Sequence, residues 1–413
     1  MIRTPLLAAL LLGAMLLGLA SPALAGDEDL RAVAQGNSAF ALDLYGRLKE
    51  KPGNLFFSPF SVSAALAMTM AGARGNTEVE MAKVLHQGLS RDRLHPALGA
   101  LIRDLNGRKA PDEEKPSAEI PAFELVLANA IFGQTGFEFL PEFLEGNRKA
   151  YDAGFSTLDF RGEPEKSRLA VNAWVEEKTR KRVKDILAPG MVTPDTRMAL
   201  ANALYFIAPW TEAFEEGATS EGDFHLDAAN SVKVPFMHRM EGYRHSDAGN
   251  FSCLVLPYRG GDLAMAVLLP KTVDGLVALE SSLKPEAFWS TMRSARRKDV
   301  EVALPKFRIE SFFNLGEILP GMGMKDAFSD KAADFSGMRA HKDLFVGLVV
   351  HKAFVKVDEK GTEAAAATVV LMKEKGIPQK DVAFVADHPF LFAIVDLKTE
   401  TVLFLGRVAN PAK

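Results

Sequence analysis

The N-terminal half of the chain repeats apolar residues at helical spacing. Between residues 29 and 50 they recur every three or four positions, and a Pro-Gly pair at 52–53 ends the pattern. Ser58 followed by Pro59 is typical of a helix start, and the run through residue 73 is rich in Ala and Met, as in a helix buried on most sides. Residues 142–151 also read as helical. Residues 166–184 predict an amphipathic helix with Leu169, Trp174 and Val183 on its apolar side.

From residue 123 the pattern is mixed, with strands expected at 123–132 and 197–207. The second half is dominated by β-type patterns, with strands expected at 232–236, 251–258, 263–269, 300–307, 344–357, 390–396 and 401–408. The polar stretch 107–121 holds three prolines and predicts a surface loop. Helices early and strands late, without regular alternation and without internal repeats, indicate an α+β fold.

Composition fits one large globular domain. The chain has 413 residues, of which 48% are hydrophobic and 25% charged, and its formal net charge is −4. A nucleic-acid partner would need a basic face, so we expect none. The nearest basic cluster is Arg293, Arg296, Arg297 and Lys298, which we interpret as a solvated rim rather than a polyanion site.

The first 25 residues predict a signal peptide. Arg3 is followed by a nearly continuous apolar run over 6–19, and Ala23-Leu24-Ala25 is a small-x-small cleavage pattern. Cleavage would leave a mature chain of residues 26–413, exported to the periplasm or the outside medium. The run is short for a membrane span, although an uncleaved anchor is the alternative. We expect no membrane partner.

No catalytic or metal-binding pattern is present in the sequence. G-x-S-x-G, H-E-x-x-H, P-loop and C-x-x-C patterns are all absent, and the eight histidines are scattered. Cys253 is the only cysteine and lies in a strand-like run, which favours a buried structural thiol over a nucleophile. We therefore expect no enzyme activity, cofactor or metal.

The most unusual segment follows a strand at 349–357. A run of small residues, Thr362 to Thr368, separates that strand from another β-branched stretch. As a strand, this run would place Thr362, Ala364, Ala366 and Thr368 on one uncharged face. Small side chains suit a segment that slides into a crowded sheet. The alternative interpretation is an ordinary flexible surface loop.

With this segment the chain resembles the serpin family over essentially its whole mature length. Residues 359–368 are similar to the hinge of inhibitory serpins almost letter for letter. Further motifs match in the expected order, at 54–59, 202–206, 305–311, 387–392 and 404–411. The resemblance is to an exported, inhibitory member of bacterial type.

The resemblance implies a single domain with three β-sheets, eight to nine helices and an exposed reactive-centre loop at about 359–383. It also implies a monomeric suicide-substrate inhibitor. The target serine protease would attack the loop and form a covalent acyl-enzyme. The loop would then insert into the central sheet and distort the protease before hydrolysis is complete.

Residue roles follow by position from the family motifs. The hinge would comprise Glu359, Gly361, Thr362, Glu363, Ala364, Ala365, Ala366, Ala367 and Thr368. Counting from Gly361 places the scissile bond at Lys375-Gly376, which would suit trypsin-like proteases, with Lys373 and Met372 as alternatives. Met372 would suggest chymotrypsin- or elastase-like targets. Ser58, Ser61, Asn202 and His351 match the family's shutter beneath the sheet, and Trp210 matches the breach where the hinge first inserts.

One local departure and one functional alternative remain open. Residues 207–209 read Ile-Ala-Pro where the family usually has a lysine and a glycine, which puts local detail near the breach in doubt. The chain could instead be a non-inhibitory serpin that acts as a binding or chaperone-like protein. Bulky, charged or proline residues in the hinge usually accompany that loss, and residues 361–368 contain no bulky or proline residue and only one charge, Glu363.

Overall fold

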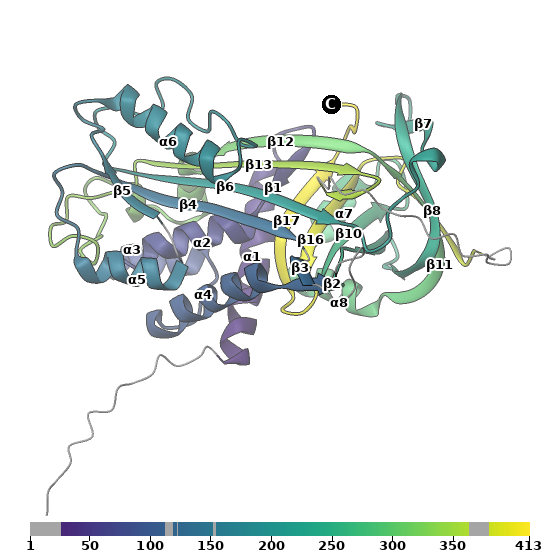
Figure 1. Cartoon of the computed structure of the whole chain (residues 1–413), viewed down its shortest axis with the longest axis horizontal. Helices are drawn as coiled ribbons and strands as arrows, with labels where there is room; N and C mark the ends of the chain where they lie inside the picture. Colours follow the sequence, from purple (N-terminus) through teal and green to yellow (C-terminus); the bar gives the residue numbers. More distant parts are fainter. Residues whose placement is uncertain (1–25, 112–118, 122, 152–153, 363–379) are drawn as a thin grey trace, which may run out of the picture.

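Figure 1 shows the computed structural model of the chain, which describes residues 26–111, 119–121, 123–151, 154–362 and 380–413. Within these ranges the chain forms nine α-helices and seventeen strands, which confirms the α+β assignment. The helices are α1 Asp27–Leu48, α2 Pro59–Met70, α3 Gly75–Val84, α4 Arg91–Gly107, α5 Pro141–Tyr151, α6 Pro164–Lys178, α7 Leu276–Ser282, α8 Pro285–Ser294 and α9 Leu315–Met322.

A six-stranded sheet runs along the length of the molecule (Figure 1). Its strand order is β12-β13-β14-β6-β4-β5. The bounds are β12 Phe307–Asn314, β13 Leu348–Asp358, β14 Gly361–Thr362, β6 Met198–Pro209, β4 Glu124–Gln134 and β5 Gly154–Leu158. Strands β13 and β6 are parallel to each other, and the short β14 is antiparallel to both.

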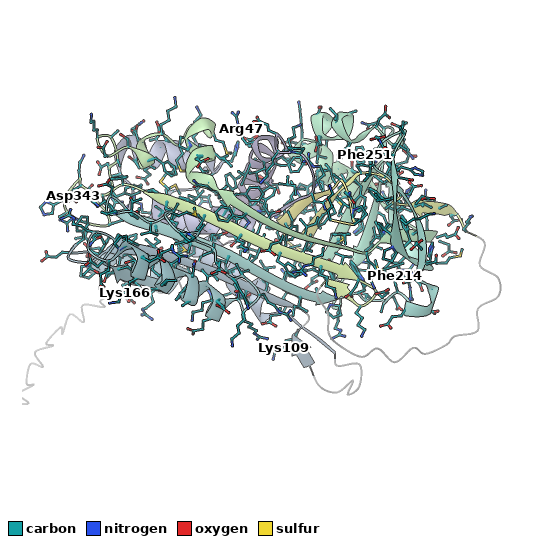
Figure 2. All side chains as sticks on the ribbon, turned by 90° about the horizontal axis from the view of Figure 1, so that it is seen from above. Arg47, Lys109, Lys166, Phe214, Phe251 and Asp343 are labelled. Carbon is teal, nitrogen blue, oxygen red and sulfur yellow. The ribbon has the colours of Figure 1, made fainter. Side chains whose placement is uncertain are left out.

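A nine-stranded sheet packs at one end of this sheet, with the order β1-β17-β16-β10-β9-β8-β11-β15 and β7 paired to β8. The bounds are β1 Leu55–Phe57, β7 Ser220–His225, β8 Ser231–Asp247, β9 Phe251–Pro257, β10 Leu263–Pro270, β11 Arg296–Pro305, β15 Val382–Val385, β16 Phe390–Asp396 and β17 Thr401–Val408. In Figure 2, Phe214 and Asp343 mark opposite ends of the long axis.

Two apolar cores lie on the two faces of the six-stranded sheet. The larger core joins helices α1 to α4 to both sheets. The smaller core lies under α6 and includes Val171 and Val175 of that helix with Ala201 and Val350 of the sheet. Helix α6 therefore covers the face of the sheet that is opposite to the main core (Figure 1).

Helix α2 forms as the sequence predicts. Ser58 is its N-cap, because the Ser58 hydroxyl accepts a hydrogen bond from the backbone N–H of Ser61 at 3.0 Å. All twelve residues of α2 are buried, as its small and apolar composition indicates. The helix thereby fixes Ser58 and Ser61 beneath the six-stranded sheet.

Two local expectations are wrong. Within the predicted loop 107–121, residues 109–111 and 119–121 pair as two short antiparallel strands, β2 and β3; prolines are tolerated there because they stand at the strand ends. Helix α6 ends at Lys178, not at residue 184, and Leu169 is 51% exposed. The helix stops because the buried Thr179 hydroxyl bonds both the Val175 carbonyl and the Val183 N–H, which turns the chain.

Candidate functional site

The six-stranded sheet is closed at one end and parted at the other. Residues 348–353 of β13 pair directly with residues 199–204 of β6. Beyond that point the two strands separate, and β14 lies between them. Thr362 pairs with Val357 on one side and Ala208 on the other, while Gly361 pairs with Asp358 and Pro209. Gly361 of the predicted hinge and Thr362, the first residue of the predicted inserting run, thus already lie in a strand of the sheet.

Thr362 is buried at this position, with 1% of its surface exposed. Its hydroxyl hydrogen-bonds the Tyr258 hydroxyl at 2.6 Å. Tyr258 in turn stacks on Trp210, with ring centroids 4.6 Å apart and planes inclined by 6°. Sequence reasoning singled out Trp210 but missed Tyr258, which lies just beyond β9 and gives no local signal. The side chain at 362 therefore lies against buried aromatic side chains, where an unpaired charge would be costly.

The turn between β13 and β14 is held by backbone bonds as well. The Trp210 indole N–H donates to the Asp358 carbonyl at 3.0 Å, and the Trp210 backbone N–H donates to the Lys360 carbonyl at 3.0 Å. At Gly361 the backbone φ is 146°, and a Cβ there would lie 2.2 Å from the Ala208 carbonyl oxygen. Only glycine fits there. Ala208 and Pro209, which depart from the family pattern, thus pair with β14 and lie in close contact with Gly361.

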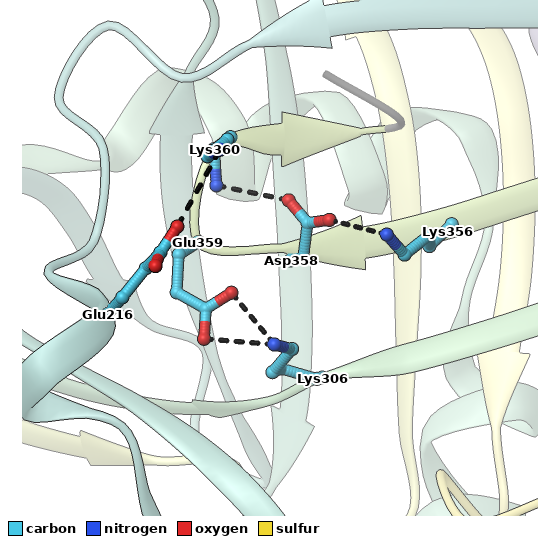
Figure 3. Close-up of a pocket in the computed structure, with 6 residues that line it drawn as sticks. All are labelled: Glu216, Lys306, Lys356, Asp358, Glu359 and Lys360. Carbon is cyan, nitrogen blue, oxygen red and sulfur yellow. Dashed lines mark hydrogen bonds and ion pairs between the residues drawn. The ribbon is translucent and has the colours of Figure 1, made fainter. Parts of the chain in front are cut away.

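A pocket of about 350 Å³ beside this turn is lined by alternating charges (Figure 3). Lys306 forms an ion pair with Glu359 at 2.9 Å, and Lys356 forms one with Asp358 at 2.8 Å. A longer ion pair, at 3.6 Å, joins Lys360 to Glu216. Burial would raise the pKa of Glu359, but hydrogen bonds from Lys306 and Thr219 outweigh it, and the net pKa is lowered. The ion pairs fix the base of the hinge at neutral pH.

The four residues assigned to the shutter lie together at the closed end of the sheet. His351 and Asn202 face each other across β13 and β6. The Ser58 backbone N–H donates to His351 Nε2 at 3.0 Å, and Asn202 Nδ2 donates to Ser61 Oγ at 2.6 Å. Sequence reasoning missed a fifth member, Asn129 of β4, whose amide oxygen accepts from Asn202 and Ser61. These bonds join three strands and α2.

His351 has a defined protonation state in this cluster. Its Nε2 accepts from an N–H, so the proton of the neutral ring is on Nδ1, where the Asn202 amide oxygen accepts it. The side chain is fully buried, and that burial lowers the pKa of His351 from 6.5 to about 3. The ring is therefore neutral throughout the physiological range.

This burial predicts a loss of stability in acid. Between pH 6.5 and about 3 the unfolded chain binds a proton at His351 that the fold does not, so the free energy of unfolding falls as pH drops, by up to about 1.4 kcal/mol per pH unit. His351→Gln keeps one donor and one acceptor but cannot titrate. In urea melts at pH 6 and pH 4, we expect the wild type to lose about 2 kcal/mol more than this variant. Equal losses in both proteins would contradict the assignment.

The remaining assigned residues fall outside the described part of the chain. These are Glu363, Ala364, Ala365, Ala366, Ala367, Thr368, Met372, Lys373, Lys375 and Gly376. Both flanks of this segment are fixed: Thr362 by β14, and the C-terminal flank by β15, which pairs in parallel with β11 at the edge of the nine-stranded sheet. Lys380 also contacts Glu301 at 2.7 Å.

The cysteine and the basic cluster singled out in the sequence lie away from the parted sheet. Cys253 is buried as expected, and burial raises the pKa of its thiol to about 12. Among the described residues no group of three or more His, Cys, Asp or Glu side chains is placed to hold a metal ion. In the same ranges no helix combines the length and apolar character needed to cross a membrane. Arg293, Arg296 and Arg297 are exposed, and Arg293 pairs with Glu400 at 2.8 Å.

Comparison with known proteins agrees with this architecture. A family model described as serpin, serine protease inhibitor, matches residues 35–411. Leukocyte elastase inhibitor of Sus scrofa is 38% identical over 393 residues, which cover 92% of this chain and 100% of that protein. Serpin B6 of Pongo abelii is 38% identical over 389 residues, covering 92% and 99%. These relatives are vertebrate proteins and give no support to the bacterial-type expectation.

Solved structures show the same likeness. Uncleaved ovalbumin superposes with a TM-score of 0.83 at 28% identity, covering 92% of this chain and 100% of that one. Serpin48 of the insect Tenebrio molitor has a TM-score of 0.80 at 32% identity, covering 93% and 98%. The chain belongs to the serpin family of serine protease inhibitors.

Proposed function

We propose that this serpin, which is an inhibitor and not an enzyme, presents the segment between β14 and β15, within the predicted loop 359–383, to a target serine protease as a bait. After attack, the cleaved loop inserts between β13 and β6 while the protease is still attached as an acyl-enzyme. The observation that carries this proposal is the half-parted sheet, in which Gly361 and Thr362 lie between two strands that pair directly further along.

The register of β14 supports a continuous insertion. If the antiparallel register of Thr362 continues, Ala364 arrives opposite Val355 and Phe206, and Thr368 arrives opposite His351 and Asn202. The residues of β13 and β6 on that face are buried against the main core. Small uncharged side chains suit it. Glu363 would face the other side, opposite Lys356.

Insertion replaces one parallel contact with two antiparallel ladders. At the closed end, the hydrogen bonds between residues 348–353 and 199–204 have to break before the strand can enter. The polar cluster also joins β13 to β6 at this end, through His351, Asn202, Ser61 and Asn129. We propose that these contacts form the kinetic barrier that keeps the intact chain in its less stable form.

The protease specificity that we propose rests on the position of the scissile bond in the loop. Counting from Gly361, which lies at the point of insertion, puts Lys375-Gly376 at the scissile bond and favours trypsin-like targets. Several relatives are named leukocyte elastase inhibitor, and an elastase-like target would instead favour Met372. Lys373 is the third candidate.

We also propose that residues 1–25 are removed on export and that residues 26–413 act as a monomer. The support for export is the pattern of Arg3, the apolar run and Ala23-Leu24-Ala25. N-terminal sequencing of protein secreted by the native host tests this directly. A mature chain that starts at Gly26 is the expected result, and retention of Met1 would contradict it.

The test of the inhibitory function is incubation with trypsin-, chymotrypsin- and elastase-like proteases. We expect a complex that survives a denaturing gel, together with a released peptide whose first residue identifies the cut site. Cleavage without any stable complex would favour a non-inhibitory serpin.

A further inference from the structure

The pocket beside the turn between β13 and β14 has the size of a small-molecule site. Its volume is about 350 Å³, and ligand pockets commonly measure ~300–1,000 Å³. All six residues that line it are charged: Glu216, Lys306, Lys356, Asp358, Glu359 and Lys360 (Figure 3). An apolar ligand would find no partner in such a lining. A ligand of this pocket therefore has to be recognised through charges and hydrogen bonds.

Two of the three carboxylates in the pocket are already held by the protein. The Asp358 carboxylate accepts the backbone N–H of Lys360 at 3.0 Å and pairs with Lys356 at 2.8 Å. The Lys306 ammonium lies 3.0 and 2.9 Å from the two carboxylate oxygens of Glu359. Asp358 is 8% exposed and Glu359 is 7% exposed. These two carboxylates and Lys306 are thus engaged with each other and with the backbone, and they are not available to a ligand.

The other three side chains keep open hydrogen-bonding capacity. An ammonium group has three N–H donors. The Lys356 ammonium pairs with one Asp358 oxygen, and its side chain is 50% exposed. The Lys360 ammonium lies 3.6 Å from Glu216, which is too long for a hydrogen bond, and the Glu216 side chain is 71% exposed. In the part of the chain that the structure describes, the pocket therefore offers two ammonium groups and one carboxylate.

We propose that this pocket binds a free acidic amino acid, glutamate or aspartate. The two carboxylates of the ligand pair with Lys356 and Lys360, and its ammonium pairs with Glu216. Two negative charges and one positive charge on the ligand thus meet two positive charges and one negative charge on the protein. Binding breaks only the long pair between Lys360 and Glu216. This site is a property of the uncut chain and does not depend on the inhibitory mechanism.

Simpler ligands complement the pocket less well. A dicarboxylate without an ammonium group reaches both lysines but brings negative charge beside Glu216 and leaves that carboxylate without a cation. A neutral amide in place of one ligand carboxylate loses one of the three ion pairs. The side chains of Lys360, Lys356 and Glu216 are 39%, 50% and 71% exposed. Exposed ion pairs each contribute little, so we expect a dissociation constant of about 1 mM.

Isothermal titration calorimetry of the full uncut protein tests the proposal, with L-glutamate, glutarate and L-glutamine as ligands at neutral pH and matched ionic strength. Glutarate lacks the ammonium group, and glutamine lacks one carboxylate. We expect glutamate to bind about three- to fivefold more tightly than either compound, because each lacks one exposed ion pair. Equal affinities for the three compounds would overturn the proposal. So would the absence of any glutamate binding at concentrations up to about 20 mM.

Two pocket variants and one control assign the binding to these side chains. Lys360→Gln should weaken glutamate binding about three- to fivefold. Glu216→Gln should remove the preference for glutamate over glutarate, because the ligand ammonium loses its partner. Lys166→Gln is the matched control, since Lys166 lies on α6, is 77% exposed and pairs with Glu163 at 2.9 Å. It should bind glutamate as the wild type does, and all three variants should keep the thermal midpoint of the wild type. Wild-type affinities and preference in both pocket variants would place the ligand elsewhere and reject the proposal.

Discussion

A Thr362→Arg variant is expected to be cut by the target protease as a substrate instead of trapping it. Thr362 is already 1% exposed in the intact chain and its hydroxyl bonds Tyr258, so an arginine at this position is expected to leave the sheet. The cleaved loop could then insert from this end only by burying an unpaired guanidinium. Burying an unpaired charge costs several kcal/mol, and each 1.4 kcal/mol slows insertion about tenfold. Hydrolysis of the acyl-enzyme would then win. The number of inhibitor molecules consumed per protease inactivated should rise at least about tenfold.

Thr362→Val is the matched control for this experiment. It keeps the shape and apolar contacts of the side chain but loses the hydrogen bond to Tyr258. We expect it to inhibit nearly as well as the wild type and to be consumed in nearly equal stoichiometry. If Thr362→Arg still traps protease efficiently, the loop can insert without the side chain at 362 in its buried strand position, and insertion that continues from β14 is wrong.

A Lys375→Ala variant is expected to lose inhibition of trypsin-like proteases and keep its fold. The specificity pocket of such enzymes holds an aspartate that pairs with a basic residue. Leaving that charge without its partner costs about 3 kcal/mol, so the rate of inhibition should fall about 100-fold or more. The thermal midpoint should not change. The measurement is the second-order rate constant of inhibition.

The neighbouring candidates provide the controls for that variant. Lys373→Ala should leave trypsin inhibition within about twofold of the wild type. If Lys375→Ala is inactive against trypsin but Met372→Ala loses inhibition of an elastase-like enzyme, the loop offers two bonds. If Lys375→Ala inhibits trypsin normally, the scissile bond lies elsewhere in the loop.

Local sequence signals predicted the elements that depend on neighbouring residues. Ser58-Pro59 fixed the start of α2, and the alternation after residue 348 predicted β13. The end of α6 was not predictable in this way, because it depends on a Thr179 hydroxyl that bonds forward and backward in the chain. The pairing of β2 with β3 was missed because the prolines of this stretch argue for a loop.

In the candidate site, too, residues in sequence motifs were predicted and residues that contribute only through tertiary contacts were missed. Motif resemblance placed Ser58, Ser61, Asn202 and His351, and the structure brings them together. Asn129 and Tyr258 were missed because each contributes through tertiary contact, from β4 and from the end of β9. A periodicity argument put Thr362 on the uncharged face of the run, and its side chain is buried. That the sheet stands open at this point is a property of three strands together, so no local pattern shows it.

Thermal unfolding of loop-cleaved protein is the most direct test of whether the bait loop is a strand kept outside its sheet. A protease that the inhibitor does not trap can be used to cut the chain between residues 363 and 379. If the segment after Thr362 is a strand kept outside its sheet, cutting frees it to enter between β13 and β6, and the midpoint should rise by more than about 10 °C, which for a chain of this size corresponds to several kcal/mol. Identical midpoints for cut and intact protein would show that no such reserve of stability exists.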